Sequence, residues 1–173
     1  MDEIQAVALL TKLKHLKEWN TKRRDIAALY SSLLSSQAGI TTPVDLFAGK
    51  NSNEVSRVWH KYTSRVLSAA YAAQGSSVLN WRDHVMGELK KRGIASMCYY
   101  PVALHLQEAF AHLGYHRGDF PIAETLAEEV LSLPMYPELT GEQVKLVSQS
   151  LKAVISEQSI VIPSTSPYPA LPV

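Results

Sequence analysis

Apolar side chains recur at intervals of three and four through the first 34 residues, and neither proline nor glycine interrupts them. This spacing places the apolar residues along one side of an α-helix. We therefore expect one long helix, or two helices placed end to end, within residues 1–36. The apolar positions are Ala6, Leu9, Leu10, Leu13 and Leu16, followed by Ile26, Ala27, Tyr30, Leu33 and Leu34.

Two further segments are rich in strand-forming residues. In residues 57–67, RVWHKYTSRVL, every second residue from Val58 to Val66 shares one face of an extended chain. Residues 94–100, IASMCYY, form the second segment, and Pro101 ends it because proline has no backbone N–H for a strand ladder. The sequence therefore predicts two strands of a small sheet.

A helix over residues 80–93 has signals at both of its ends. Asn80 is a preferred N-cap residue, and Asp83 lies near the positive start of the helix. Gly93 readily adopts the left-handed conformation that ends a helix. Further along, residues 104–115 predict a short helix that stops at Gly114.

Residues 118–144 predict a helix, a break and a second helix. Pro121 suits the first position of a helix, and the helix must end before Pro134. Thr140 and Gln143 have the spacing of a capping box for the final helix. The expected apolar stripes are Ile122, Leu126 and Val130 in the first helix, and Val144, Val147, Leu151 and Val154 in the second.

These elements together predict an α+β fold in which helices pack on a small sheet and a long helix precedes them. We divide the chain into a linking helix over residues 1–36, a small domain over 37–157 and a tail over 158–173. The tail contains four of the nine prolines and is expected to be extended or disordered. Small and turn-forming residues predict a connection over 35–56 and a mobile loop over 68–79.

Composition narrows the class of protein. Hydrophobic residues make up 46% of the chain and charged residues 19%, which is typical of a globular protein. The net charge of +1 gives no general attraction to nucleic acid or to an anionic membrane, so we expect neither as a partner. The basic residues between Lys12 and Arg24 are expected to form a solvated face. No segment has the length and apolarity of a membrane span, and the N-terminus does not have the pattern of a signal peptide.

The single cysteine, Cys98, excludes an intramolecular disulfide and a cysteine-based zinc site. It lies in an apolar segment with no motif that links it to a base, so we expect a buried structural thiol. His112 and His116 are four positions apart, but Gly114 lies between them and no further ligands complete a set, so we predict no metal. A reducing, cytoplasmic location is expected.

Several motifs agree, in order and spacing, with one known family. They are KLKHLKEWN, RRDIAALY, VWHKYTSRV, YYPVALHLQ, LGYHRGDFPIAE and LSLPMYPELTGEQV. Over residues 2–155 the chain resembles the C-terminal portion of the DegT/DnrJ/StrS family of sugar aminotransferases. Members of this family are fold-type I enzymes that use pyridoxal phosphate to aminate keto-sugars attached to nucleotides. The resemblance implies the small C-terminal domain of such an enzyme.

The resemblance also implies what this chain does not supply. In the family, the large domain provides the lysine that forms the Schiff base and the residues that hold the cofactor ring, so we expect no catalytic and no cofactor-binding residue here. The chain has ten lysines, and most are expected on exposed helix faces. A solvated lysine, with an ordinary pKa of about 10.4, is protonated and unreactive at neutral pH.

Tyr100 and His105 are the candidate substrate-binding residues, because the resemblance places them near the mouth of the family's active site. An aromatic face for stacking and an imidazole for a phosphate or hydroxyl group suit a nucleotide-sugar. Alternatively, Tyr100 ends a strand and His105 caps the helix that follows. For His60 we expect a hydrogen-bonded core or rim residue, and for Arg82 and Asp83 helix capping and charge pairing.

Two classes of function follow. In the first, the chain is a C-terminal fragment of a sugar-nucleotide aminotransferase and is inactive without the large domain. In the second, it is a stand-alone, non-catalytic module that binds a nucleotide-sugar or pairs with an intact aminotransferase. In both, the apolar side of the first helix predicts association with a second copy or with a large-domain partner, since that side is exposed when nothing covers it.

Overall fold

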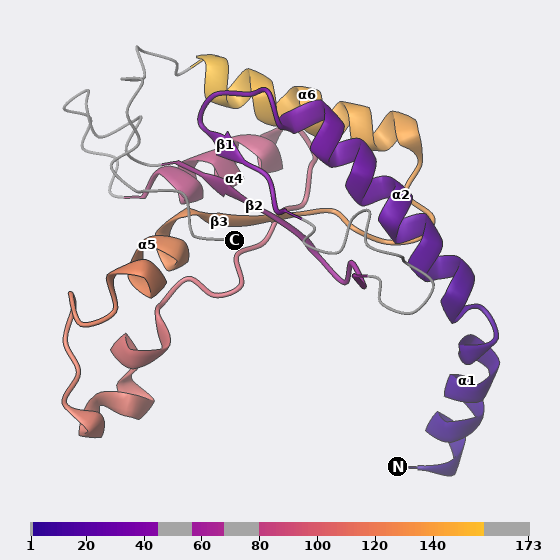
Figure 1. Ribbon diagram of the computed structural model, residues 1–173, viewed down its shortest axis with the longest axis horizontal. Coiled ribbons are helices and arrows are strands. Elements are labelled where there is room, and N and C mark those ends of the chain that lie inside the picture. Colours follow the sequence, from indigo (N-terminus) through magenta and orange to yellow (C-terminus); the bar gives the residue numbers. More distant parts are fainter. Residues whose placement is uncertain (1, 45–56, 68–79, 158–173) are drawn as a thin grey trace.

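A computed structural model describes residues 2–44, 57–67 and 80–157. Three antiparallel strands form one sheet in the order β1 (Ile40–Thr41), β2 (Tyr62–Val66) and β3 (Val130–Leu133). Three helices lie on one side of this sheet, namely α2 (Leu16–Leu34), α4 (Trp81–Lys91) and α6 (Gly141–Glu157) (Figure 1). The predicted α+β class is confirmed. The predictions made for 45–56, 68–79 and 158–173, including Lys50, lie outside the described residues.

The core lies between the sheet and these helices. On β2, Tyr62, Ser64 and Val66 are buried, as their alternation predicts. The Tyr62 ring stacks on Tyr30 of α2 with their centroids 4.9 Å apart. The predicted stripe of α6 is likewise confirmed, since Val144, Val147, Leu151 and Val154 are all buried.

The first helical segment consists of two helices, which is the second of the two predicted forms. Helix α1 (Glu3–Leu13) ends at Leu13, with Lys14 as its C-cap residue, and α2 begins at Leu16. Ile26, Ala27, Tyr30 and Leu34 of α2 are buried, whereas no residue of α1 is. The apolar side of α2 therefore joins the core, whereas the apolar residues of α1 stay outside it.

Strand β2 is shorter than the predicted strand over residues 57–67. Its ladder with β3 ends at the pair Tyr62 and Leu133. The next pair would contain Pro134, which has no N–H to donate. Val58 and His60 consequently lie outside the strand and are exposed, so the prediction of His60 as a core or rim residue is wrong.

The strand predicted over residues 94–100 is also wrong. Only Met97 pairs there, through an isolated bridge to Ser132. The third strand is β3, which was predicted as the end of a helix. Its sequence, VLSL, is too short for periodicity to distinguish a strand from a buried helical turn, and pairing with β2 decides the outcome.

Helix α5 (Pro121–Glu129) begins at Pro121 as predicted, but its buried side differs from the predicted stripe. Ile122 and Leu126 are exposed, and the buried residues are Glu124, Ala127 and Glu129. The two carboxylates tolerate burial because both are paired. Glu129 accepts a hydrogen bond from Arg65 of β2 at 2.6 Å, and the partners of Glu124 form the site described below.

The helix predicted over 104–115 consists of two 3₁₀ helices, η1 (Leu104–Leu106) and η2 (Glu108–Leu113). Gln107 between them is extended, with ψ at 141°, which prevents a continuous α-helix. Gly114 ends the second one with φ at +74°, as predicted.

Arg82 has a larger role than the predicted charge pairing with Asp83. The pair exists, with Arg82 Nε 2.6 Å from Asp83 Oδ1, but the Arg82 side chain is only 1% exposed. Its Nη1 donates to the Ala127 carbonyl at 2.9 Å and to Cys98 Sγ. Cys98 is half-buried and lies outside any strand, so the prediction of a buried thiol in a strand is wrong. Its partial burial raises the pKa of the thiol.

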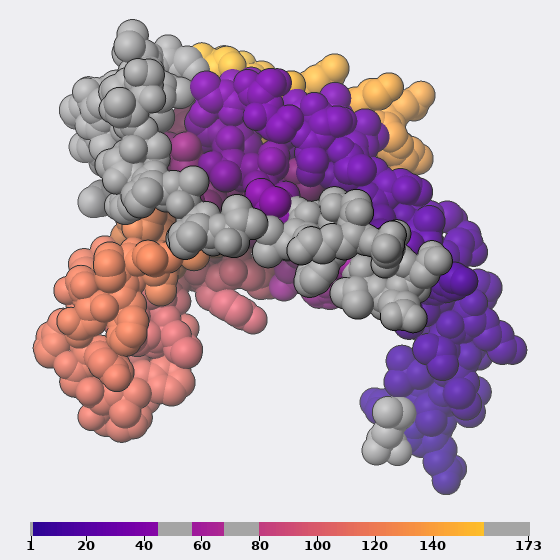
Figure 2. All heavy atoms as spheres, in the orientation of Figure 1, coloured from indigo at the N-terminus to yellow at the C-terminus, as the bar shows by residue number. Residues whose placement is uncertain are grey.

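The molecule has the shape of an arch. Helix α1 extends from one end of the body, and the segment from η1 to α5 extends from the other (Figure 1). The space-filling view shows the hollow between these two extensions (Figure 2). No helix among the described residues is long and apolar enough to cross a membrane.

Candidate functional site

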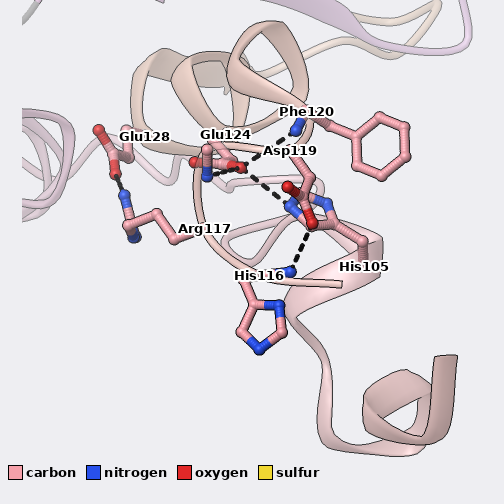
Figure 3. A network of polar contacts seen from close by, with 8 residues as sticks. His105, His116, Arg117, Asp119, Phe120, Glu124 and Glu128 are labelled. Atoms are coloured by element: carbon pink, nitrogen blue, oxygen red, sulfur yellow. Dashed lines mark hydrogen bonds and ion pairs between the residues drawn. The ribbon is translucent and has the colours of Figure 1, made fainter. Parts of the chain in front are cut away.

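A buried polar cluster lies where η1, the loop over residues 114–120 and the first turn of α5 meet (Figure 3). Its centre is the contact between His105 Nε2 and Glu124 Oε1, which are 2.9 Å apart. The two side chains are 8% and 9% exposed. His105, a candidate from the sequence, is thus joined to an acidic residue that sequence reasoning missed.

Glu124 also completes the start of α5. Phe120 is the N-cap residue, and its side chain cannot accept a hydrogen bond from the first turn. The Glu124 carboxylate instead turns back and accepts from the N–H of Gly118 at 2.8 Å and from the N–H of Phe120 at 3.4 Å. It also lies at the positive end of the helix, which favours its negative charge.

The hydrogen bonds determine the charge of Glu124. Burial raises the pKa of its carboxyl group, but the hydrogen bonds from Gly118, His105 and Phe120 together outweigh burial and hold the pKa below its ordinary value. Glu124 is therefore ionised at neutral pH. Because an ionised carboxylate only accepts, the contacting nitrogen of His105 must carry the proton and donate it.

The loop around this pair is held by further polar contacts (Figure 3). Asp119 Oδ2 accepts from the His116 N–H at 2.8 Å, and Arg117 Nη1 lies 2.9 Å from Glu128 Oε1. The Phe120 ring meets the edge of the His105 ring with centroids 4.8 Å apart. The polar contacts hold the loop, and Phe120 packs against the imidazole.

Tyr100, the other candidate from the sequence, lies apart from this cluster. No hydrogen bond or ring contact joins it to His105 in the described part of the chain. Its side chain is 71% exposed, and its ring meets Tyr99 edge-on at 6.0 Å. The Tyr99 ring in turn lies below the ammonium group of Lys61, 3.0 Å from the ring centroid. Tyr100 therefore belongs to an exposed aromatic surface and not to the polar cluster.

A sequence signal for Glu124 existed. The segment PIAE places a carboxylate in the first turn after a proline, and no Ser, Thr, Asn or Asp stands at the N-cap position. A first-turn acid commonly stabilises a helix start, so its position was foreseeable. Its contact with His105, 19 positions earlier, depends on the folded loop.

The lysines of the described segments do not fit a Schiff-base role. Such a lysine needs burial or a cationic neighbour that lowers its pKa. None of the described lysines is buried, and seven of them are exposed, namely Lys12, Lys14, Lys17, Lys22, Lys90, Lys91 and Lys145. The hydrogen bond to Glu18 raises the pKa of Lys22, which is the opposite of what is needed. We therefore assign no step of cofactor chemistry to these residues.

Among the described residues, no three His, Cys, Asp or Glu side chains gather as a metal site. His112 lies in η2, His116 follows it, and both are exposed.

Helices lie on one side of a small antiparallel sheet, and the structural neighbours of this fold are aminotransferases, of which the chain covers about 35–38%. The family model of the DegT/DnrJ/EryC1/StrS aminotransferase family matches residues 1–152. The chain belongs to this family, whose enzymes depend on pyridoxal phosphate.

Individual relatives agree with this assignment. The chain is 40% identical over 153 residues to the "Pleiotropic regulatory protein" of Geobacillus stearothermophilus, covering 87% of this chain and 36% of the relative. It is 35% identical to a UDP-N-acetyl-3-dehydro-alpha-D-glucosamine 3-aminotransferase of Acidithiobacillus ferrooxidans, covering 90% of this chain and 36% of that protein. Its fold is similar to that of S. venezuelae DesV in complex with a ketimine intermediate, with a TM-score of 0.73, 33% identity, and 94% and 38% of the two chains covered. The chain thus spans little more than a third of the length of these relatives.

Proposed function

We propose that this chain is the small C-terminal domain of a sugar-nucleotide aminotransferase and that it acts only together with a large domain. The complete enzyme would transfer an amino group from an amino acid to a nucleotide-linked keto-sugar. Bound pyridoxal phosphate would carry the amino group during the transfer. The family assignment and the partial coverage of the relatives support this proposal.

The observation that carries the proposal is the uncovered surface of α1. Ile4 is 80% exposed and Leu13 is 61% exposed. These two residues are nine positions apart, so at about 100° per residue they point to opposite sides of the helix. A helix that is apolar on opposite sides is stable when it is enclosed on more than one side. A large domain can enclose α1 on more than one side.

In this arrangement His105 and Tyr100 would contact the nucleotide-sugar. His105 offers an imidazole whose orientation is held by Glu124, and Tyr100 offers an exposed ring. The hollow between α1 and the η1–α5 segment is the side on which a large domain would complete the site (Figure 2). This chain would supply one wall of the pocket and would not supply the reactive amine.

Complementation tests the proposal. The part of the Geobacillus relative that this chain does not match would be produced separately, loaded with pyridoxal phosphate and mixed with this chain. We expect a stable complex and amino transfer to a nucleotide-linked keto-sugar that neither chain supports alone. The variant Leu10→Glu should abolish complex formation, while Lys12→Gln on the polar side of α1 should not. No complex and no gain in activity would overturn the proposal.

A stand-alone, non-catalytic binding module is the alternative function. The buried His105–Glu124 pair favours it, because both residues and their supporting loop come from this chain alone. In that case the chain without any partner would bind a UDP-linked sugar, as measured by calorimetry. Binding of equal strength with and without the large-domain chain would favour the module over the fragment.

A further inference from the structure

The free nitrogen of His105 is defined by the contact that its other nitrogen makes. Nε2 donates to Glu124, and Nδ1 makes no hydrogen bond within the described part of the chain. In the described segments, the fully buried polar atoms that lack a partner are Ser64 Oγ, His84 Nε2, Ser96 Oγ and Ser148 Oγ. The Nδ1 atom of His105 is not one of them, so it is not fully buried. Nδ1 therefore keeps access to the outside of the cluster, while Nε2 is committed to Glu124.

Glu124 is well suited to hold this orientation. Its Oε1 accepts three hydrogen bonds, and two of the donors are backbone N–H groups that cannot rotate away, those of Gly118 and Phe120. The carboxylate is thus fixed by the main chain before it meets the imidazole. Phe120 packs against the same imidazole, so one loop fixes both the acceptor and the ring.

The charges around the cluster select the kind of group that Nδ1 can meet. Asp119, Glu124 and Glu128 contribute three carboxylates, and Arg117 contributes one cation that is already paired with Glu128. The carboxylates of this surrounding outnumber its one paired guanidinium group, which disfavours a phosphate group. A neutral imidazole with Nε2 protonated presents a lone pair at Nδ1, and a lone pair accepts a hydrogen bond from a hydroxyl group.

We propose that Glu124 is a positioning residue that holds His105 through Nε2. In this orientation, Nδ1 accepts a hydrogen bond from a hydroxyl group of the sugar and does not contact the phosphate groups of the nucleotide-sugar. This inference rests on the proposed function for its ligand. The orientation of His105 itself does not rest on it and can be tested in the chain alone.

The first experiment is NMR of the imidazole N–H groups in the ¹⁵N-labelled chain. We expect a His105 Nε2–H signal that exchanges slowly with water, because the proton is buried and hydrogen-bonded. Glu124→Gln should keep the signal, since its amide oxygen still accepts, and Glu124→Ala should abolish it. Glu128→Gln, one turn further along α5 and in a surface ion pair, is the matched control and should leave the signal unchanged. A rapidly exchanging His105 N–H in the unchanged chain would overturn the positioning role.

The second experiment uses the complex with the large-domain chain. The probes are UDP-N-acetylglucosamine, UDP alone and inorganic phosphate. We expect Glu124→Ala to weaken binding of UDP-N-acetylglucosamine about tenfold and to leave binding of UDP unchanged, with Glu124→Gln and Glu128→Gln within about twofold of the unchanged chain. An equal loss for UDP and for UDP-N-acetylglucosamine, or a His105 Nδ1 shift caused by phosphate alone, would overturn the hydroxyl contact.

The two experiments separate the possible failures. If the slow Nε2–H signal is present but no complex binds UDP-N-acetylglucosamine, the positioning of His105 stands and the proposed function fails. If the complex binds the sugar nucleotide but Glu124→Ala binds it as tightly as the unchanged chain, the proposed function stands and the role of Glu124 fails.

Discussion

At the scale of single residues, buried polar side chains link segments that are distant in sequence. Arg82 joins α4 to the end of α5 through the Ala127 carbonyl, and Tyr30 of α2 donates to the Pro134 carbonyl at 3.1 Å. Tyr62 and Ser31 share a hydrogen bond of 2.9 Å. A buried polar group without a partner costs about 1–3 kcal/mol, so each of these contacts helps to select this one packing.

The two buried tyrosines predict a loss of stability at high pH. Burial raises the pKa of Tyr30 and of Tyr62 above the ordinary value of 10.0. Above about pH 10 the unfolded chain therefore releases protons that the folded chain keeps, so stability is complete below that pH and falls as pH rises further. The expected loss is up to about 1.4 kcal/mol per pH unit for each tyrosine that stays protonated in the folded state.

Urea unfolding at pH 8 and at pH 11 measures this effect. Tyr30→Phe should be less stable at pH 8, because the Pro134 carbonyl loses its donor, and should lose less stability on going to pH 11. Tyr115→Phe, at an exposed position, is the control and should follow the unchanged chain. An equal pH dependence of Tyr30→Phe and the unchanged chain would contradict the assignment to Tyr30.

At the scale of elements, the helices α4, α5 and α6 each begin with a different device. Asn80 Oδ1 accepts from the Asp83 N–H at 3.3 Å at the start of α4. Helix α5 starts with Pro121 and uses the carboxylate of Glu124 for the preceding N–H groups. Helix α6 has the predicted capping box of Thr140 and Gln143. These devices matter because the first N–H groups of a helix have no partner within it.

The capping box gives a prediction for α6. Thr140 Oγ1 accepts from the Gln143 N–H at 3.2 Å, and Gln143 Oε1 accepts from the Thr140 N–H at 2.9 Å. Thr140→Ala should lower the free energy of unfolding by about 1 kcal/mol. Thr140→Ser keeps the hydroxyl group and should remain within about 0.5 kcal/mol of the unchanged chain. Thermal unfolding measures both, and a Thr140→Ala variant of unchanged stability would show that the box does not stabilise α6.

At the scale of the whole molecule, apolar side chains remain exposed on both ends of the arch. Helix α1 carries Val7 and Leu10 at one end, and Leu104 and Ile122 lie at the other. The body between them has a continuous core. Exposed apolar patches often mark sites of association, so we expect both ends to take part in association.

Sedimentation of the isolated chain tests this view. We expect concentration-dependent self-association, because α1 has no other cover in the absence of a large domain. The double variant Leu9→Glu and Leu13→Glu should sediment as a monomer, whereas Lys12→Glu on the same helix should behave like the unchanged chain. A monomer at all concentrations for the unchanged chain would contradict the role of α1 as an association surface.

The sequence was most informative where the physical cause is local. The caps at Asn80 and Thr140 and the stops at Gly93 and Gly114 depend on residues within one helical turn. The stripe of α6 depends only on the period of the helix. The family resemblance depended on motif order along the chain, and the family match over residues 1–152 confirmed it. The division into three segments remains a prediction.

What only the tertiary structure decided depends on residues that are far apart. Strand β3 exists because β2 pairs with it, and Pro134 limits how far that pairing runs. The buried carboxylates of α5 are stable because each has a partner from elsewhere in the chain. Glu129 pairs with Arg65, which lies 64 positions earlier, and Glu124 pairs with His105, which lies 19 positions earlier. Periodicity treats a glutamate as a surface residue, since burial of a charge becomes favourable only when the fold brings its partners to it.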